Sequence, residues 1–255
     1  MKAIVLAAGY ATRLYPLTKT AAKPLLPVGG RPMIDHLLDR IREVEEVDAV
    51  HVVTNHRFAD AFGDWASTRD VIVHDDGTTN EDDRLGAIGD IAFVVDRAGL
   101  DDDDLLVIAG DNLFDYSLAD YVQWWKGKGE ASAVVLYDVG DLELVKKYSN
   151  VEVDDDERLV SFVEKPEHPA STLVATASYL YHRAHLPLLR RYLDEGNPPD
   201  HPGRLVAWLV SRAPVYGYTA GGHWRDIGDA GQLLEADNHL RALAGLPLRS
   251  SYSLD

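Results

Sequence analysis

Short apolar runs alternate with amphipathic segments along the first part of the chain, and this alternation limits the possible folds more than any other feature. The apolar runs predict buried strands, and the segments with apolar residues at helical spacing predict helices between them. The expected strands cover residues 2–8, 49–54, 71–74 and 105–109, and the expected helices cover residues 31–44, 58–66 and 85–98. This order predicts an α/β fold with a mostly parallel sheet flanked by helices on both faces.

From about residue 131 the pattern becomes richer in strands. We expect strands over residues 131–139, 149–153, 159–164, 173–181 and 215–218, and helices over residues 184–194, 203–211 and 229–244. No hexapeptide period occurs, so we expect no C-terminal β-helix. No linker divides the chain, and the sequence predicts one domain over residues 1–255 whose tail, from about Arg249, is loosely held.

The charge balance limits the classes of partner. The chain has 42 acidic and 25 basic residues, and its net charge of −17 argues against binding nucleic acid or anionic membranes, which require a basic face. No apolar run approaches the roughly 20 residues that span a bilayer. The chain contains no cysteine, which excludes disulfides, thiolate catalysis and Cys-ligated metals. We expect a cytoplasmic protein.

The segment after the first strand has the composition of a phosphate-binding loop. Small residues let backbone N–H groups approach a phosphate closely, and Arg13 and Lys23 add two cations. The segment is neither a Walker A loop nor a GxGxxG motif. A strand-to-helix turn with surface cations is the alternative interpretation. The loop residues that we expect to bind a nucleotide are Leu6, Ala7, Ala8, Gly9, Ala11 and Thr12.

Five motifs in order along the chain resemble those of sugar-1-phosphate nucleotidylyltransferases of the glucose-1-phosphate thymidylyltransferase type. The first is the loop just described with Lys23-Pro24, and the second is Leu85-Gly86, where the family places a base-binding turn. The remaining three are Gly110-Asp111-Asn112, the run from Phe162 to Pro166 that contains Glu164-Lys165, and the run from Trp224 to Asp229. Together they span nearly the whole chain.

The resemblance implies a Rossmann-like, mixed and mostly parallel sheet with an interleaved, β-richer acceptor-binding part. The nucleotide-binding half would cover about residues 1–130, the acceptor-binding half about residues 131–228, and a C-terminal helix about residues 229–248. It also implies a reaction in which NMP passes from a pyrimidine NTP to a sugar 1-phosphate or a similar phosphorylated acceptor, with release of pyrophosphate.

The resemblance also implies roles for charged side chains. Arg13 would grip the leaving pyrophosphate, Lys23 the α-phosphate or the bridging oxygen, and Lys165 the phosphate of the acceptor. Mg²⁺ would be held by Asp111 and Asp226, since hard cations prefer carboxylate oxygens. Two alternatives remain open: Asp111 could cap a helix, and Asp226 could be a turn residue.

The base pocket is implied to involve Leu85, Gly86 and Asn80. An amide such as Asn80 offers both a donor and an acceptor to a base edge, although Asn80 could instead be a turn residue. The sequence does not choose among CTP, UTP and dTTP.

The acceptor site departs from the family pattern. Ala11, Ser149 and Ala177 stand where the family has glycine, and the added atoms lead us to hypothesise an acceptor other than glucose 1-phosphate. Glu164 and Lys165 could instead form an exposed salt bridge, and Arg225 could pair with Asp229. The residues expected at the acceptor are Asn112, Ser149, Glu164, Lys165, Ala177, Tyr179 and Arg225.

Other functions stay open at this point. One is a cytidylyltransferase for a phosphocholine-like or phosphonate acceptor, and another is a non-catalytic nucleotide-sugar sensor or regulatory subunit. A glycosyltransferase would not need Arg13 and Lys23 to hold a leaving pyrophosphate. Tryptophans at Trp124-Trp125 and Trp208 are compatible with packing or with a homo-oligomer contact.

Overall fold

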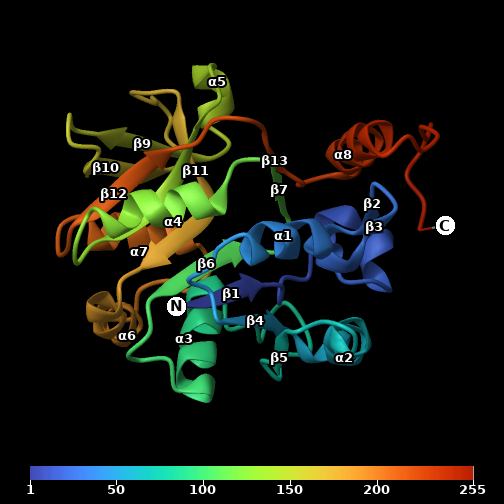
Figure 1. The fold of residues 1–255 in the computed structure, drawn as a ribbon, viewed down its shortest axis with the longest axis horizontal. Helices are drawn as coiled ribbons and strands as arrows, with labels where there is room; N and C mark the ends of the chain where they lie inside the picture. Colours follow the sequence, from blue (N-terminus) through green and yellow to red (C-terminus); the bar gives the residue numbers. More distant parts are fainter. Residues whose placement is uncertain (255) are drawn as a thin grey trace.

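A seven-stranded sheet forms the centre of the molecule in the computed structural model, which describes residues 1–254 (Figure 1). The strand order is β12-β8-β11-β6-β1-β4-β5. Neighbouring strands are parallel except where β11 runs antiparallel to β6 and β8. The predicted mixed, mostly parallel sheet is therefore confirmed. The strands are β1 (Lys2–Leu6), β4 (Ala49–Thr54), β5 (Ile72–Asp75), β6 (Leu105–Ala109), β8 (Ser132–Asp138), β11 (Leu173–Tyr181) and β12 (Val215–Thr219).

Helices cover both faces of this sheet, because side chains alternate between the two faces along each strand. In β1, Ala3 and Val5 join one apolar cluster and Ile4 joins the other. The first cluster contains residues of α1 (Met33–Arg42), α2 (Ala59–Ala66) and α4 (Leu118–Lys126). The second contains residues of α3 (Ala87–Ala98), α6 (Leu186–Asp194) and α7 (Pro202–Leu209).

Three two-stranded sheets and several short helices complete the fold. The sequence patterns did not indicate most of these pieces, since a strand of two or three residues shows no periodicity. The paired strands are β2 (Pro27–Val28) with β3 (Arg31–Pro32), β7 (Asn112–Phe114) with β13 (Trp224–Asp226), and β9 (Ser149–Val153) with β10 (Leu159–Glu164). The short helices are α5 (Leu142–Val145) and the 3-10 turns η1 (Thr12–Leu14), η2 (Leu17–Lys19), η3 (Lys23–Leu25), η4 (His56–Phe58) and η5 (Arg183–His185).

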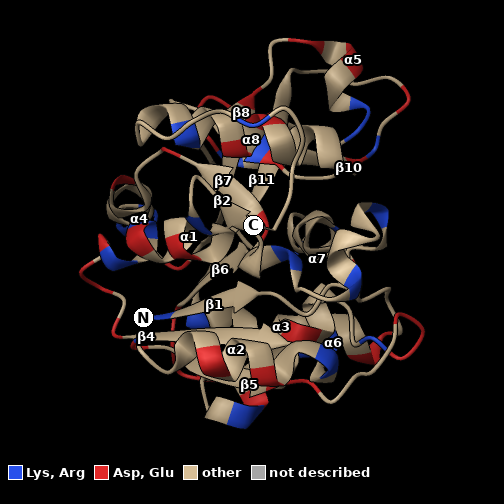
Figure 2. Ribbon diagram, turned by 90° about the vertical axis from the view of Figure 1, so that its right-hand side faces the viewer, with Lys and Arg blue, Asp and Glu red and all other residues tan. Residues whose placement is uncertain are grey.

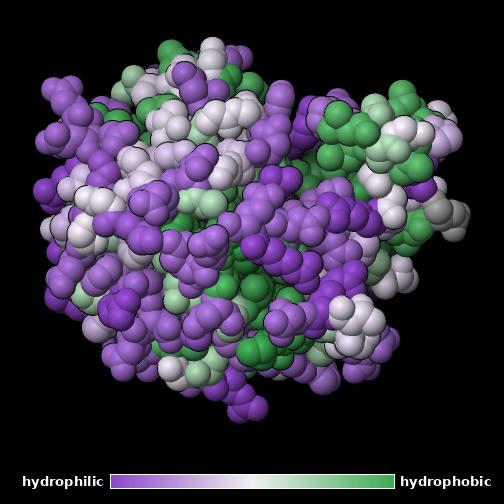
Figure 3. Space-filling model, in the orientation of Figure 1, coloured by the Kyte–Doolittle hydropathy of each residue, from purple (hydrophilic) through white to green (hydrophobic). Residues whose placement is uncertain are grey.

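The C-terminal helix α8 (Ala230–Leu243) packs on a third apolar cluster that includes Leu26 and Met33. It matches the helix expected over residues 229–244 to within one residue at each end. It stops short of residue 248, because Gly245 adopts a left-handed backbone and Pro247 cannot continue a helix. Leucines at and beyond its end are exposed, and apolar surface is visible at this side of the molecule (Figure 3).

The expectation of a loosely held tail is wrong for the described residues after α8. The side-chain oxygen of Asn238 accepts a hydrogen bond from the Arg249 backbone N–H at 2.7 Å, and its amide nitrogen donates to the Arg249 carbonyl at 2.9 Å. The Tyr252 hydroxyl donates to the Pro27 carbonyl at 2.8 Å. Side-chain bonds of this kind, made to distant segments, do not appear in a composition pattern.

Acidic residues are spread over helices and loops on several sides of the molecule, with basic residues among them (Figure 2). The acid excess therefore lies mainly on solvated faces. None of the helices within residues 1–254 has the length and apolar character that crossing a bilayer would take.

Candidate active site

A cavity of about 410 Å³ opens beyond the carboxyl ends of the central strands, the edge where open α/β sheets bind ligands. The segment after β1 forms one wall, and the N-terminal turn of α3 faces it. Ala177 reaches the cavity from a bulge in β11. The lining residues are Leu6, Ala7, Ala8, Gly9, Tyr10, Ala11, Arg13, Leu14, Lys23, Pro24, Asp76, Glu81, Arg84, Gly86, Ala87, Asp90, Ala109, Asp111, Ala177, Asp200, His201, Pro202, Asp226 and Gly228.

The loop after β1 is anchored from behind and open in front. The Ala7 N–H donates to the Val53 carbonyl at 2.8 Å, and the buried Asn55 amide donates to the Ala8 carbonyl at 2.9 Å. A Cβ added at Gly9 would meet no atom within 4 Å, so a ligand can approach the backbone there. Ala11 has φ of 46°, a left-handed conformation that normally favours glycine.

Two carboxylates and two cations lie together at one end of the cavity, which we call the cationic end: Arg13, Lys23, Asp111 and Asp226. The largely buried Lys23 Nζ lies 2.6 Å from Asp111 Oδ2. Short strands β7 and β13 pair antiparallel, with Asp226 opposite Asn112, and this pairing holds Asp226 beside Asp111.

The charges of the cationic end act in opposite directions on Asp226. Burial raises the pKa of Asp226, the nearby Asp111 raises it further, and Lys23 and Arg13 oppose these effects. No group of three or more metal-ligating side chains occurs among residues 1–254. A metal here would thus be held by two carboxylates with phosphate oxygens completing its shell, an arrangement that suits Mg²⁺.

The N-terminus of α3 is pressed against the segment that leads into α7. Gly86 has φ of +77°, and a Cβ added there would lie 2.8 Å from the carbonyl carbon and oxygen of Pro199. The Ile88 N–H also donates to the Pro199 carbonyl at 2.8 Å. Only glycine fits this close approach, so the Leu85-Gly86 turn fixes the wall of the cavity opposite the loop after β1.

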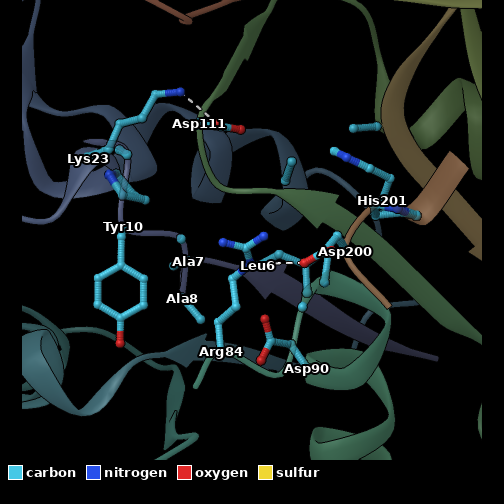
Figure 4. Close-up of a pocket in the computed structure, with 18 of the residues that line it drawn as sticks. Leu6, Ala7, Ala8, Tyr10, Lys23, Arg84, Asp90, Asp111, Asp200 and His201 are labelled. Atoms are coloured by element: carbon cyan, nitrogen blue, oxygen red, sulfur yellow. Dashed lines mark hydrogen bonds and ion pairs between the residues drawn. The ribbon is translucent and has the colours of Figure 1, made fainter. Parts of the chain in front are cut away.

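Asp76 and Asp90 lie at the other end of the cavity with Arg84 and its partners Glu81 and Asp200; we call this the acidic end. Figure 4 shows Lys23 and Asp111 at one side of the pocket and Arg84 and Asp90 at the opposite side, with Leu6, Ala7 and Ala8 between them. Arg84 Nε donates to Asp200 Oδ1 at 2.9 Å, and Arg84 also pairs with Glu81 at 3.1 Å.

Two oxygens of these aspartates, Asp76 Oδ2 and Asp90 Oδ1, are buried and have no hydrogen-bond partner within residues 1–254. Burial, together with the charge of the nearby Asp76, raises the pKa of Asp90 to about 8. Burial also raises the pKa of Asp76. The acidic end therefore favours a neutral carboxyl group at Asp90.

Of the residues predicted to bind the nucleotide, three do not line the cavity. Thr12 is exposed, and Leu85 directly precedes Gly86, which does line the cavity. Asn80 is exposed, and its amide nitrogen bonds to Thr79 and Asp83 while its oxygen accepts the Asp82 N–H. The side chain is thus used within its own turn, and its role at a base stays a prediction.

The residues predicted at the acceptor lie in different parts of the structure, and of them only Ala177 lines the cavity. Asn112 is buried, and its Oδ1 accepts the Trp224 indole N–H at 3.0 Å. Ser149 is buried, and its Oγ accepts the Ala175 N–H at 3.2 Å.

The other acceptor residues lie around the cavity. Glu164 is half-buried near the buried Tyr179, whose pKa rises well above its ordinary value through burial, with smaller contributions from neighbouring charges that include Glu164. Lys165 is exposed with φ of 47°. Among residues 1–254, no ion pair joins Glu164 to Lys165 or Arg225 to Asp229. Arg225 instead borders a second cavity of about 240 Å³, which Asp226 also lines.

Several lining residues escaped the sequence interpretation, notably Tyr10, Asp76, Asp90, Arg84 and His201. One signal was available for Asp90. It occupies a position on the otherwise apolar inner face of α3, between Ile88, Ile91 and Val94. A charged residue on such a face is rarely buried without a function or a partner.

The sequence is also similar to those of known proteins. The nucleotidyl transferase family model matches residues 2–242. A UTP–glucose-1-phosphate uridylyltransferase of Synechocystis is 30% identical over 239 residues, covering 89% of this chain and 60% of the relative. A glucose-1-phosphate thymidylyltransferase of Streptomyces antibioticus is 29% identical over 241 residues, covering 93% of this chain and 65% of the relative.

Solved structures share the fold. A Bacillus anthracis structure has a TM-score of 0.80 at 25% identity and covers 94% of this chain and 95% of that one. A UDP-glucose pyrophosphorylase complexed with UDP-glucose also has a TM-score of 0.80, at 20% identity, covering 95% of this chain and 98% of that one. The chain spans 54–65% of the length of the curated relatives that it matches. Because the family model covers nearly all of the sequence, the chain belongs to the nucleotidyl transferase family.

Proposed function

We propose that the protein is a Mg²⁺-dependent nucleotidylyltransferase that transfers NMP from a pyrimidine NTP to a sugar 1-phosphate or a similar phosphorylated acceptor. The observation that carries this proposal is the cationic end. There Lys23 lies 2.6 Å from Asp111 and Asp226 lies beside them, at the mouth of an open backbone loop. Two cations and two carboxylates suit a polyphosphate with a divalent ion, whereas neither a simple sugar nor a peptide needs that combination.

The chemistry requires charge neutralisation and positioning more than proton transfer. An oxygen of the acceptor phosphate attacks the α-phosphorus, the bond from that phosphorus to the bridging oxygen breaks, and pyrophosphate leaves with the electron pair. The acceptor phosphate is already ionised, so no general base is needed. Arg13 would hold the leaving pyrophosphate with its planar fork, and Lys23 would neutralise charge at the α-phosphate or the bridging oxygen.

Asp111 and Asp226 would hold Mg²⁺, which when bound supplies Lewis-acid stabilisation of charge on the phosphate oxygens. Lys23 orients Asp111 through their contact. Burial raises the pKa of Asp226, so a cation beside it would stabilise its ionised form. These two effects prepare the pair for a cation before the substrate arrives.

The roles that we propose at the acceptor rest on where the residues lie in the fold. Glu164, at the end of β10, would accept hydroxyl hydrogen bonds, and the exposed Lys165 would reach the acceptor phosphate. The curated relatives include enzymes named for glucose 1-phosphate and mannose 1-phosphate. The methyl group of Ala177 lines the cavity of this chain, and we propose an acceptor smaller than glucose 1-phosphate or differently substituted.

The test is pyrophosphate release with Mg²⁺ across CTP, UTP, dTTP, ATP and GTP, each against glucose 1-phosphate, other sugar 1-phosphates, phosphocholine and 2-aminoethylphosphonate. Turnover that needs both a pyrimidine nucleotide and a phosphorylated acceptor would support the proposal. Nucleotide binding without turnover across this grid would favour a sensor. Absence of nucleotide binding would overturn the proposal.

A further inference from the structure

The second cavity, of about 240 Å³, has an aromatic lining, and we call it the aromatic cavity. Asp226 lines both this cavity and the main one, so both border a carboxylate proposed to hold the metal. Tyr137 of β8, Tyr148 just before β9 and Trp224 of β13 bring three rings to its wall. The phosphate chemistry proposed above uses none of these rings.

The three rings are held in place and inclined to one another. Tyr148 contacts Trp224 at 5.2 Å between ring centroids, with 67° between the ring planes, and Tyr137 contacts Trp224 at 5.9 Å and 49°. The Trp224 indole N–H donates to Asn112 Oδ1 at 3.0 Å, and the Tyr137 hydroxyl donates to the Gly222 carbonyl at 3.2 Å. Inclined rings of this kind surround a small rounded group from several sides, as aromatic cages do for quaternary ammonium ions.

The rest of the lining offers few partners for the hydroxyl groups of a sugar. Val139, Leu144 and Ile227 are apolar, and the side-chain oxygen of Gln232 already accepts the Gly228 N–H at 2.7 Å. A sugar bound there would exchange its hydrogen bonds to water for unpaired hydroxyls, which is costly. The methyl groups of a quaternary ammonium ion form no such hydrogen bonds, so burial costs that ion less.

The charges around the aromatic cavity also favour a cation. Two carboxylates line it, those of Asp226 and the exposed Glu235 of α8. Because Asp226 would serve the metal, Glu235 is the carboxylate left for a cationic ligand. Arg225 is the one basic lining residue, but side chains alternate along β13, which directs Arg225 away from the face that Trp224 and Asp226 share. On that other side Arg225 borders a further cavity near Asp115.

The aromatic cavity adjoins the residue proposed for the acceptor phosphate. The Lys165 backbone N–H donates to the Tyr148 carbonyl at 2.8 Å. Burial and, to a smaller extent, the charge of the nearby Asp226 raise the pKa of the Tyr148 hydroxyl. Tyr148 is therefore close to both the cation and the carboxylate that the proposed function assigns to phosphate and metal. A group joined to that phosphate by a short chain would enter the aromatic cavity.

We propose, on the basis of the proposed function, that the aromatic cavity binds a quaternary ammonium group of the acceptor. The rings of Tyr137, Tyr148 and Trp224 surround this group, and Glu235 supplies its counter-charge. The acceptor is then a phosphorylated alcohol that carries such a group, for which phosphocholine is the probe.

A neutral acceptor of the same shape tests the recognition of charge. The compound is 3,3-dimethylbutyl phosphate, which has a carbon atom where phosphocholine has its nitrogen. Pyrophosphate release by the full chain with Mg²⁺ and each of CTP, UTP, dTTP, ATP and GTP would give kcat/KM for both acceptors and for glucose 1-phosphate. Desolvated cation–π contacts predict that kcat/KM for phosphocholine is at least about tenfold higher than for its neutral isostere.

Variants of Tyr148 connect this preference to an aromatic ring. Tyr148→Leu should raise the KM for phosphocholine by about tenfold and leave kcat nearly unchanged, because the ring contacts the ammonium group and not the reacting phosphate. Tyr148→Phe keeps the ring and should recover most of that loss. Titration calorimetry with the nucleotide and thermal unfolding show whether each variant is folded.

A second pair of variants tests the counter-charge. Glu235→Gln should lower the preference for phosphocholine over its neutral isostere by about threefold or more, since the ammonium group loses a nearby carboxylate. Glu45→Gln removes the same charge from an exposed residue that lines none of the described cavities, and its preference should match that of the unaltered protein.

The outcomes separate the inference from the proposed function. Equal use of phosphocholine and its neutral isostere, turnover with sugar 1-phosphates alone, or nucleotide binding without turnover of phosphocholine would overturn the inference and leave the proposed function standing. A preference for the charged acceptor that persists in both Tyr148→Leu and Glu235→Gln would overturn the role of the aromatic cavity. Failure of every nucleotide to bind would count against the proposed function itself.

Discussion

At the cationic end of the cavity the carboxylates have cations beside them, whereas at the acidic end Asp76 and Asp90 have one another. Asp111 contacts Lys23, and at Asp226 burial and the charge of Asp111 raise the pKa while Lys23 and Arg13 partly offset the rise. Asp90 forms no ion pair within residues 1–254, and burial raises its pKa to about 8. A buried carboxyl group can be stabilised by a counter-charge or by a proton, and the choice determines which ligand it can meet.

The largest expected effect comes from removing a carboxylate at the cationic end. Asp226→Asn should reduce Mg²⁺-dependent pyrophosphate release by at least about a hundredfold, because charge stabilisation at the reacting phosphate is lost. Asp102→Asn, at an exposed position far from the cavity, removes the same charge and should retain turnover. Unchanged turnover in Asp226→Asn would mean that the carboxylate of Asp226 does not stabilise charge at the reacting phosphate.

The variant Lys165→Ala tests whether Lys165 contacts the phosphate of the acceptor. A lost hydrogen bond to a charged group should raise the KM for the acceptor by about 10–100-fold and leave nucleotide affinity nearly unchanged. Steady-state kinetics and calorimetry measure the two quantities separately. Equal losses in both would place Lys165 at the nucleotide instead.

A backbone comparison at the two ends of α3 sharpens the contrast further. Gly86→Ala would drive a Cβ to 2.8 Å from the Pro199 carbonyl, whereas a Cβ at Gly99, which also has a positive φ, would meet nothing within 4 Å. Gly86→Ala should cost about 1–3 kcal/mol more than Gly99→Ala. Denaturant unfolding measures the loss in the free energy of unfolding for each variant. Equal losses would show that the segment at Pro199 shifts to make room for a Cβ at residue 86.

The protonated aspartate predicts a pH dependence of stability. The folded state keeps a proton on Asp90 that the unfolded chain releases near its ordinary pKa of 3.8. This contribution is fully present below about pH 4, falls as the pH rises, and is lost above about pH 8. Asp90→Asn cannot titrate, so its melting temperature should gain about 2–6 °C on the unaltered protein between about pH 5 and pH 8. A constant difference would mean that Asp90 is ionised throughout.

Ala11→Gly should have the smallest effect. Glycine relieves the left-handed conformation at φ of 46° but adds freedom to the unfolded chain, so the free energy of unfolding should change by no more than about 1 kcal/mol. Nucleotide affinity should change less than about threefold. A larger loss of affinity would show that the methyl group of Ala11 shapes the phosphate-binding loop directly.

The sequence predicted those parts of the molecule that depend on local pattern. Strands β4, β6, β9, β10 and β11 have the expected bounds because long apolar or alternating runs define them. The pairing of β7 with β13 was not predictable, since it joins two three-residue segments far apart in the chain. The Asp76–Asp90 pair escaped prediction for a related reason: only the fold brings a residue after β5 against the inner face of α3.

The same pairing of β7 with β13 determines when the site is complete during synthesis. The last strand of the central sheet, β12, ends at Thr219, and Asp226 lies in the segment that follows it. A nascent chain can therefore pair all seven strands and form the loop after β1 while Asp226, one of the two carboxylates proposed to hold the metal, is still missing. Folding of the scaffold comes before competence for chemistry, and a chain arrested between the two events would be folded but inactive.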